Sequence, residues 1–278
     1  MTLTNKHMRL QEWFRSNSPV ALAFSGGVDS SLLLAVGREV LGAKLMPITV
    51  RSAFYPAREA REAEELSKKL DIHILWLEAD PLGEPAIAAN PENRCYLCKL
   101  AVFNHIIAEA RSLGIKTIID GTNVDDLNDY RPGAKALKEL AVRSPLMELG
   151  FTKAEIRELS KQYGLEGWDK PAYACLASRI PYGETITPKK LAAVEAAEDA
   201  LFELGFRQLR VRHHGTVARI EVPVEDMARF CDRALQEEVN RRIREAGFRY
   251  VALDLAGYQM GSLNAGITPA PENTAPKK

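Results

Sequence analysis

Two sets of residues have the types and spacing to do chemistry: a Ser-Gly-Gly-Val-Asp-Ser loop at residues 25–30, and the cysteines at positions 95, 98 and 175. The loop follows an apolar run, 20–24, that predicts a buried parallel strand, and it leads into a segment that predicts an amphipathic helix. Glycines let the backbone approach a bound group closely, and a helix start offers N–H groups and partial positive charge to a phosphate. Asp29 could neutralise that helix end or hold a metal ion that the phosphates share. The competing interpretation is a strand-to-helix turn that binds nothing.

The cysteines suggest metal or thiol chemistry. Cys95 and Cys98 form a Cys-x-x-Cys pair directly before a predicted helix, and residues 91–94 before them resemble an exposed loop. This spacing suits a zinc half-site, a redox disulfide or two ligands of an iron–sulfur cluster. No second Cys-x-x-Cys or close histidine pair completes a zinc site, which disfavours zinc. Cys175 lies far along the chain, where Ser178 and Arg179 would lower its pKa and help to hold an anionic substrate.

Other polar residues are candidates for binding. Arg210 and Arg212 alternate along a predicted strand, 208–212, so both should face one side and suit a phosphate or carboxylate. Glu198 precedes them on a long predicted helix, where it is either a base or orienting group, or a solvent-facing helical residue. Candidates with an equally good structural explanation are Asp125, Asp126, Trp168, His213 and His214.

Strand-like and helix-like segments alternate through the first half of the chain, which predicts an α/β fold with a doubly wound parallel sheet. The predicted strands are 20–24, 45–50, 72–77 and 117–120, and the predicted helices are 1–18, 56–70, 96–113 and 152–163. Thr152 and Glu155 form a capping box at the start of the last helix. Ligands bind at the carboxyl ends of such strands, so the loops 25–30, 51–56, 80–94 and 121–133 should meet at one pocket.

The second half predicts a smaller α+β domain. A helix at 187–204, strands at 208–212 and 217–222, a helical region at 224–245 with a break near Asp232, and a strand at 250–255 are expected. We therefore predict a nucleotide-binding domain at 1–165, an active-site loop carrying Cys175 at 166–186, the small domain at 187–262 and a disordered tail at 263–278.

Composition excludes several classes of function. The 278 residues include 37 basic and 37 acidic side chains, so no overall basic field exists to attract nucleic acid. No apolar run reaches membrane-spanning length and the first residues do not form a signal peptide, so we expect a cytoplasmic protein with no membrane partner. Four cysteines in a chain of this size do not indicate a disulfide scaffold. The fourth, Cys231, is expected to be buried on a helix face.

The loop at 25–30 resembles the SGGxDS signature of the PP-loop ATP pyrophosphatases, which cleave ATP between its α- and β-phosphates. It is not a Walker loop, because no Lys-Ser/Thr pair follows its last glycine. The blocks 121–123, 129–133, 174–179 and 210–215 make the chain similar to the LarE family over residues 8–261. That family inserts sulfur into a pyridinium dicarboxylate mononucleotide, on the route to the nickel-pincer nucleotide cofactor.

The LarE resemblance implies a set of cofactors and site residues. It implies ATP and Mg²⁺, a catalytic group of Cys175, Glu198, Ser178 and Arg179, and substrate binding by Arg179, Arg210 and Arg212. ATP would contact Ser25, Gly26, Gly27, Val28, Asp29, Ser30, Val50, Gly121 and Asp126, with Asp29 as the Mg²⁺ ligand. Cys95, Cys98 and Cys175 match the branch in which three cysteines ligate a [4Fe–4S] cluster. In the other branch, which lacks the Cys-x-x-Cys pair, the cysteine matching Cys175 gives up its own sulfur. The resemblance also implies a homo-oligomer such as a hexamer.

Three other functions stay open at this point. A PP-loop tRNA thiolase also combines this loop with a cluster-binding Cys-x-x-Cys, although the neutral charge disfavours it. An ATP-dependent amidotransferase would need an ammonia source, and the sequence indicates no glutaminase domain. An ammonia-using synthetase of this fold would not need Cys175. A non-catalytic nucleotide-binding regulator would explain the loop but not the placed cysteines and arginines.

Overall fold

The computed structural model describes residues 1–128, 132–171 and 174–259. The chain divides into two compact units: residues 1–177 with 185–191, and residues 178–184 with 192–278. Both units take a piece of the segment 178–191, so the polypeptide passes between them more than once. The predicted tail at 263–278 and the residues 129–131 of one family block lie outside the described residues.

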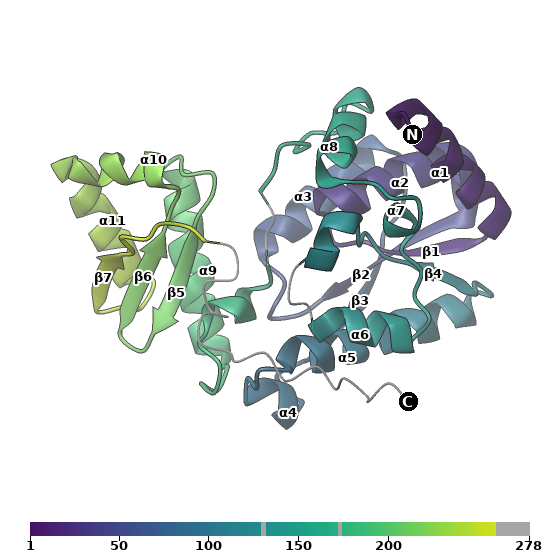
Figure 1. Ribbon diagram of the computed structural model, residues 1–278. Coiled ribbons are helices and arrows are strands. Elements are labelled where there is room, and N and C mark those ends of the chain that lie inside the picture. Colours follow the sequence, from purple (N-terminus) through teal and green to yellow (C-terminus); the bar gives the residue numbers. More distant parts are fainter. Residues whose placement is uncertain (129–131, 172–173, 260–278) are drawn as a thin grey trace, which may run out of the picture. The chain divides into compact units, whose positions relative to one another are not determined.

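The first unit is built on a parallel sheet of four strands in the order β3-β2-β1-β4 (Figure 1). The strands are β1 (Val20–Ala23), β2 (Leu45–Arg51), β3 (Leu75–Glu78) and β4 (Thr117–Ile119). Every pair is parallel, which confirms the predicted doubly wound α/β fold. The chain moves from β1 to β2 and β3 on one side and then returns to place β4 on the other. The loops after β1 and β4 therefore meet at the switch point where such sheets bind ligands.

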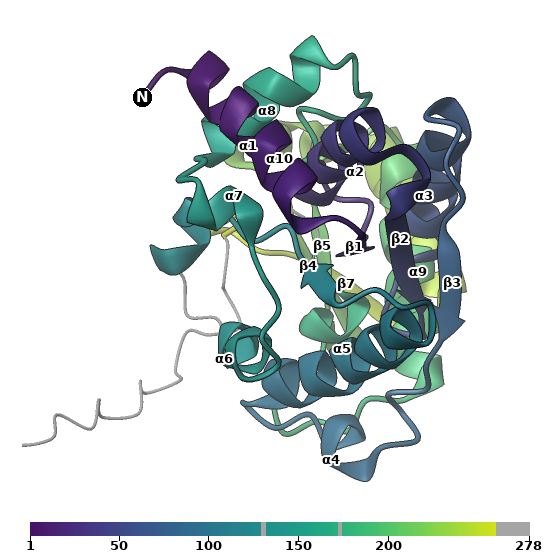
Figure 2. The same cartoon turned by 90° about the vertical axis from the view of Figure 1, so that its right-hand side faces the viewer.

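Helices cover both faces of this sheet (Figure 2). One face carries the helices α1 (Leu3–Asn17), α2 (Val28–Leu41), α3 (Ala57–Lys69), α7 (Pro145–Glu148) and α8 (Lys153–Gln162). The other carries α5 (Arg94–Ser112) and α6 (Pro132–Glu139), and the short α4 (Pro85–Ala88) precedes α5. Short 3₁₀ turns lie at η1 (Gly42–Lys44), η2 (Val124–Asn128) and η3 (Leu176–Arg179).

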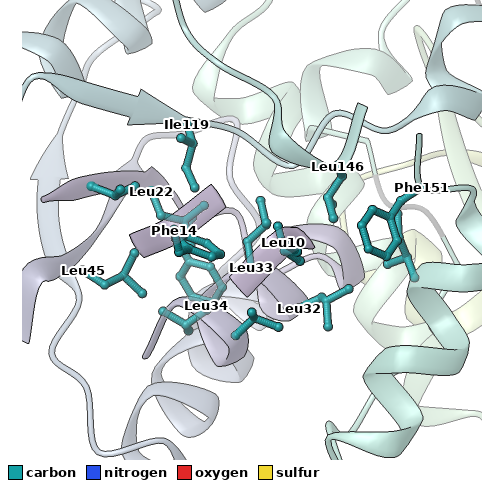
Figure 3. Packing of buried hydrophobic residues seen from close by; sticks show 14 of the residues in the cluster. Leu10, Phe14, Leu22, Leu32, Leu33, Leu34, Leu45, Ile119, Leu146 and Phe151 are labelled. Atoms are coloured by element: carbon teal, nitrogen blue, oxygen red, sulfur yellow. The ribbon is translucent and has the colours of Figure 1, made fainter. Parts of the chain in front are cut away.

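The alternation of β1 residues divides the core of this unit into two layers. Leu22 joins the cluster formed with α1 and α2, including Phe14 and Leu33, whereas Ala21 joins the cluster formed with α5 (Figure 3). The sequence predicts that helix α2 is amphipathic, but this prediction is wrong, because every residue from 30 to 37 is buried. It lies between the sheet, α1 and α8, so nearly every side of its first half meets protein.

Helix α8 begins as the sequence predicts. Thr152 accepts a hydrogen bond from the Glu155 N–H, and the Glu155 carboxylate accepts one from the Thr152 N–H, which confirms the capping box. Lys6 of α1 adds an ion pair to Glu155 at 2.7 Å. These contacts fix the start of α8, where the side chain of Lys153 begins.

The second unit contains a small mixed sheet in the order β5-β6-β7. The strands β5 (Arg210–His214) and β6 (Val217–Glu221) are antiparallel, and β7 (Tyr250–Leu253) is parallel to β6. The connection to β7 runs through α10 (Val224–Met227), η4 (Ala228–Cys231) and α11 (Arg233–Glu245), and helix α9 (Pro188–Glu203) leads into β5.

The predicted break near Asp232 is confirmed, because Asp232 is the N-cap of α11 and accepts a hydrogen bond from the Leu235 N–H at 2.8 Å. The prediction of a buried Cys231 is wrong: this residue is exposed. It lies in η4, before the break, and so belongs to a 3₁₀ turn rather than to the apolar face of α11. Across the described residues, none of the helices has the length and apolar character needed to cross a membrane.

Candidate functional site

The loop after β1 is closed on itself by its own hydroxyl groups. Ser30 Oγ donates to the Gly27 carbonyl at 3.1 Å and accepts from the Ser25 N–H at 3.3 Å. Gly26 turns the chain at a φ of 75°, a left-handed conformation that glycine adopts without strain. Ser30 is buried, whereas Ser25 and Gly27 are exposed. The loop is therefore preformed, and the first N–H groups of α2 follow it directly.

Gly121 lets the end of β4 lie against the start of α2. A side chain at this position would place its Cβ 3.1 Å from both the Ser30 N–H nitrogen and the Asp29 Cβ. Because Gly121 has no side chain, the end of β4 and the start of α2 can form one wall of the site, although Gly121 and Ser30 are 91 positions apart (121 − 30). Val50, expected beside the nucleotide, lies near the carboxyl end of β2 and packs against the α5 core cluster.

Asp29 has two partners from distant segments. Its Oδ2 lies 2.6 Å from Lys153 Nζ, and its Oδ1 accepts a hydrogen bond from Asn123 Nδ2 at 3.3 Å. Both charged side chains are mostly buried, with 27% of the Lys153 side chain and 23% of the Asp29 side chain exposed. The lysine ammonium therefore supplies a positive charge at the place where the sequence predicts a cation.

The loop after β4 is held by its own acidic residues. Asp126 Oδ2 accepts from the Asn123 N–H at 3.0 Å, and Asn123 Oδ1 accepts from the Asp125 N–H at 2.9 Å. Asp125 Oδ2 accepts from the Lys153 N–H at 2.6 Å. Asp125 and Asp126 thus orient Asn123 and Lys153, the two groups that contact Asp29.

The loop after β2 joins the loop 25–30, called the phosphate loop from here on, to the segment that carries Cys175. Tyr55 donates its hydroxyl to the Ser25 carbonyl at 3.1 Å, and the Phe54 carbonyl accepts from the Leu176 N–H at 3.0 Å. Burial raises the pKa of Tyr55, and Glu59 and Glu62 add to the rise, so the phenol remains a donor at neutral pH. Of the loops predicted to meet at the strand ends, 51–56 and 121–133 are thus each hydrogen-bonded to the segment 25–30.

The two Cys-x-x-Cys residues lie inside a helix, not before it as expected. Helix α5 begins at Arg94, so Cys95 and Cys98 occupy its first turn. The expected exposed loop before them is also partly wrong, because Arg94 is buried by its contacts to Asn90 and to the Ala177 carbonyl. A helix start of this kind directs both thiols to one side of the first turn.

Cys175 lies within electrostatic reach of this pair. Burial raises the pKa of the Cys98 thiol to about 12, and the neighbouring thiols of Cys175 and Cys95 add to the rise. Arg94 and Lys99 act in the opposite direction. The fold therefore brings together three thiols whose negative forms repel one another, and a positively charged metal group would relieve this repulsion.

The three cysteines offer thiols, which are ligands that both zinc and iron–sulfur clusters accept. Within residues 1–128, 132–171 and 174–259, no three histidine, cysteine, aspartate or glutamate side chains are arranged to hold one ion. In a [4Fe–4S] cluster each cysteine binds a different iron, so thiols that stand farther apart are compatible with such a group.

In the second unit, Arg179 and Glu198 form a buried bidentate ion pair. Arg179 Nε and Nη2 donate to the two Glu198 oxygens at 2.9 and 2.8 Å, and only 1% of Arg179 and 5% of Glu198 is exposed. Glu198 Oε1 also accepts from the Val211 N–H at 3.0 Å. The interpretation of Glu198 as a solvent-facing helical residue is therefore wrong. The Glu198 carboxylate accepts hydrogen bonds from three N–H groups.

The two strand arginines are also buried. Arg212 donates to both Glu221 oxygens, at 3.0 and 2.8 Å, and to the Ser178 carbonyl at 2.9 Å. Arg210 donates to the Leu209 carbonyl at 2.7 Å and lies over the Tyr258 ring. The alternative of a solvated strand face is wrong for both.

Several guanidinium groups surround the buried carboxylates of this cluster. Burial lowers the pKa of Arg210, and the neighbouring Arg179 and Arg212 guanidinium groups lower it further, whereas Tyr258 and Glu198 raise it. Arg179 pairs with Glu198, and Arg212 pairs with Glu221, which also pairs with Arg219 at 2.9 Å. Guanidinium groups suit the anionic groups of a substrate.

The remaining candidates lie apart from these clusters or in structural contacts. His213 is buried beside the Phe248 ring, and burial lowers the pKa of its exposed neighbour His214. Trp168 is exposed, with the Lys161 ammonium 5.0 Å from its ring centre. Neither histidine joins a group of metal ligands among the described residues.

Sequence reasoning missed the residues that organise the site, and the reason is sequence distance. These are Tyr55, Arg94, Asn123, Lys153 and Glu221. Lys153 and Asn123 reach Asp29 across 124 and 94 positions. The one local signal was the capping box, which placed Lys153 at the start of a helix without indicating what the helix start faces.

The sequence of this chain is similar to those of several known proteins. No protein-family model matches the chain. An uncharacterized protein of Synechocystis sp. is 42% identical over 266 residues, 96% of this chain and 99% of the relative. The pyridinium-3,5-bisthiocarboxylic acid mononucleotide synthase of Lactiplantibacillus plantarum is 36% identical over 270 residues, 97% of each chain. A tRNA-specific 2-thiouridylase of Rickettsia typhi is 28% identical over 188 residues, 55% of this chain and 52% of the relative.

Proposed function

Because this chain belongs to the LarE family of ATP-dependent sulfurtransferases, we propose that it adenylates a carboxylate of a small nucleotide and converts it to a thiocarboxylate. The proposed substrate is pyridinium-3,5-biscarboxylic acid mononucleotide, and the product is a precursor of the nickel-pincer nucleotide cofactor. The observation that carries this proposal is the association of three cysteines in the same unit as a preformed phosphate loop, with Phe54 and Tyr55 linking the two.

The chemistry needs two displacements. A substrate carboxylate oxygen first attacks the α-phosphorus of ATP, pyrophosphate leaves, and a mixed anhydride with AMP forms. A sulfide then attacks the activated carbonyl carbon, and AMP leaves with the original carboxylate oxygen. The residues 25–30 and the α2 start would hold the pyrophosphate group, where N–H donors stabilise its developing charge.

Asp29 is the proposed ligand for Mg²⁺. One carboxylate beside serine hydroxyls, with the remaining positions filled by phosphate oxygens and water, is the donor set that this ion prefers. The Lys153 ammonium, held 2.6 Å from Asp29, marks the position as one that accepts a cation. When bound, the ion would neutralise phosphate charge during pyrophosphate departure.

Cys95, Cys98 and Cys175 are the proposed ligands of a [4Fe–4S] cluster. Such a cluster would supply sulfide for transfer from the iron that has no protein ligand. The role of this chain is to hold three thiols in place, with Arg94 and Lys99 offsetting part of their negative charge.

The arginine cluster of the second unit is proposed to bind the anionic groups of the substrate. Glu198 and Glu221 hold Arg179 and Arg212 in position, and the buried Arg210 guanidinium lies near Arg179 and Arg212. Ser178 accepts from Arg179 Nη1 at 3.0 Å and so belongs to the same network. Glu198 is therefore proposed as an orienting group more than as a proton acceptor.

We further propose a cytoplasmic homo-oligomer, such as a hexamer, that acts without nucleic acid. The neutral net charge supports the last point, since nucleic-acid binding relies on basic surface. Light scattering after size-exclusion chromatography measures the oligomeric state, and the absorbance ratio of purified protein reports bound RNA.

The test uses protein purified without oxygen. We expect about four irons and a matching amount of acid-labile sulfide per chain, lost when Cys95, Cys98 or Cys175 is replaced by serine. With ATP, Mg²⁺ and the dicarboxylate nucleotide, pyrophosphate release and the thiocarboxylate product should appear together. Cys231→Ser is the matched control and should change neither result, because Cys231 lies exposed in η4.

Two other results would replace parts of this proposal. An iron-free protein that loses the elements of H₂S from Cys175 after one turnover would establish sacrificial sulfur transfer in place of the cluster. Co-purified tRNA that becomes thiolated with ATP would make the chain a tRNA thiolase.

A further inference from the structure

Arg94 connects the two segments that carry the three cysteines. Its Nη1 donates to Asn90 Oδ1 at 2.6 Å and to the Ala177 carbonyl at 2.9 Å, across 83 positions of sequence. Its Nη2 lies 3.5 Å from the Sγ of Cys95. With 2% of the residue exposed, these bonds form away from water. One guanidinium thus touches the first turn of α5 and the backbone two residues after Cys175.

The segment after Cys175 is anchored from a second side. The Leu176 N–H donates to the Phe54 carbonyl at 3.0 Å, and both Leu176 and Ala177 are buried. Cys175 itself is exposed. The backbone around Cys175 is therefore fixed by contacts of its neighbours, while its thiol remains accessible to a ligand.

The geometry points to Arg94 as a positioning residue that holds the Cys175 segment against Cys95 and Cys98 and so sets three thiols for one shared ligand. This inference rests on the proposed function only in naming that ligand as an iron–sulfur cluster. Arginine suits the task because its planar fork donates to separate acceptors at the same time, which the single ammonium of lysine does less well. Its positive charge also offsets the repulsion among the thiols.

The test measures the arrangement of the thiols without any metal. A Cys95→Ser/Cys231→Ser background leaves only Cys98 and Cys175 of the four cysteines. Dibromobimane becomes strongly fluorescent when it links two nearby thiols, and monobromobimane rates on each thiol correct for reactivity. In this background Arg94→Met should slow the corrected cross-linking by about tenfold, because the effective concentration of one thiol near the other falls. Arg94→Lys should slow it less.

Arg38→Met is the matched control, since Arg38 binds the Leu70 carbonyl and Asp71 at the far end of α2. It should leave cross-linking unchanged. Thermal melts monitored by circular dichroism establish that each variant is folded at the temperature used. If Arg94→Met does not fold, Arg94→Lys decides the question, because it too must cross-link more slowly than its parent.

Cross-linking as fast in the Arg94 variants as in the parent would overturn the inference. A merely structural role would lower the melting temperature and leave the corrected cross-linking rate unchanged. The two proposals fail separately: a chain with all four cysteines whose thiols cross-link but which takes up no iron would remove the cluster and leave the role of Arg94 intact.

Discussion

Lys153 Nζ lies 2.6 Å from Asp29 Oδ2, although the two residues are 124 positions apart in the chain. The ion pair joins the start of α8 to the start of α2, which follows the loop after β1. Because Asp29 lies in the segment 25–30 that we propose to hold the phosphates of ATP, we expect Lys153 to exchange its carboxylate partner for a phosphate when Mg²⁺ and ATP bind.

Lys153→Met should therefore weaken binding of Mg²⁺ and a non-hydrolysable ATP analogue by about tenfold, the loss of one charge-assisted hydrogen bond to phosphate. Isothermal titration calorimetry measures this without catalysis. Lys116→Met, at an exposed position, is the control and should bind as the parent does. Unchanged affinity in Lys153→Met would mean that the lysine only balances Asp29.

Glu198→Gln should destabilise the second unit, because it leaves the Arg179 guanidinium buried without its full counter-charge. Breaking a buried ion pair by changing one partner costs about 3–5 kcal/mol, so a clear fall in melting temperature is expected. Glu237→Gln breaks an exposed pair with Arg233 and should change the melting temperature little. If Glu198→Gln instead loses activity but keeps the melting temperature of the parent, Glu198 acts as a proton acceptor rather than as an orienting group.

Gly121→Ala should lower ATP affinity by pushing the end of β4 away from Ser30 and Asp29. Gly114→Ala is the matched control: its φ of 75° makes alanine cost about 1 kcal/mol of stability, but open space surrounds the position. We expect both variants to be less stable and only Gly121→Ala to bind the ATP analogue more weakly. If Gly121→Ala and Gly114→Ala bind the ATP analogue equally well, the loop 25–30 tolerates the displacement of the end of β4.

The thiol of Cys98 should react with iodoacetamide along an unusual pH profile. Its pKa rises from 9.0 to about 12, so in the folded, metal-free chain the reactive thiolate keeps increasing above pH 9. Each pH unit from 8 to 11 should raise the rate about tenfold. Peptide mass mapping after short pulses gives the rate for Cys98 alone. In the denatured chain the same peptide should react at half its maximal rate near pH 9 and level off above about pH 10.

The same pKa sets the direction of a stability effect. Between about pH 9 and 12 the folded chain keeps the Cys98 proton that the unfolded chain has lost. The unfolded state then binds fewer protons, so the free energy of unfolding falls as pH rises through this range. Cys98→Ala should remove this part of the pH dependence. A folded-state profile with a midpoint near 9 would contradict both expectations.

The sequence by itself determined the fold class of the first unit and the identity of its phosphate loop. Short apolar runs that alternate with segments of helical periodicity predict parallel strands with helices between them. Gly26, Gly27 and Asp29 fall within four successive positions, where the loop after β1 leads into α2. The capping box at Thr152 and the break at Asp232 were equally readable, because each is set by hydrogen bonds within four residues.

Only the tertiary structure decided which side chains complete the site. Contacts between distant residues depend on how the strands and helices pack, and no local sequence pattern predicts them. Examples are the contacts of Lys153 with Asp29, of Arg94 with the Ala177 carbonyl, and of Arg212 with Glu221. The sequence left the burial of Glu198 open and misjudged the exposure of Cys231 for the same reason. Periodicity shows which face of a helix is apolar, but a buried ion pair or a 3₁₀ turn depends on neighbours elsewhere in the chain. Local rules therefore determined the elements, and long-range contacts determined their chemistry.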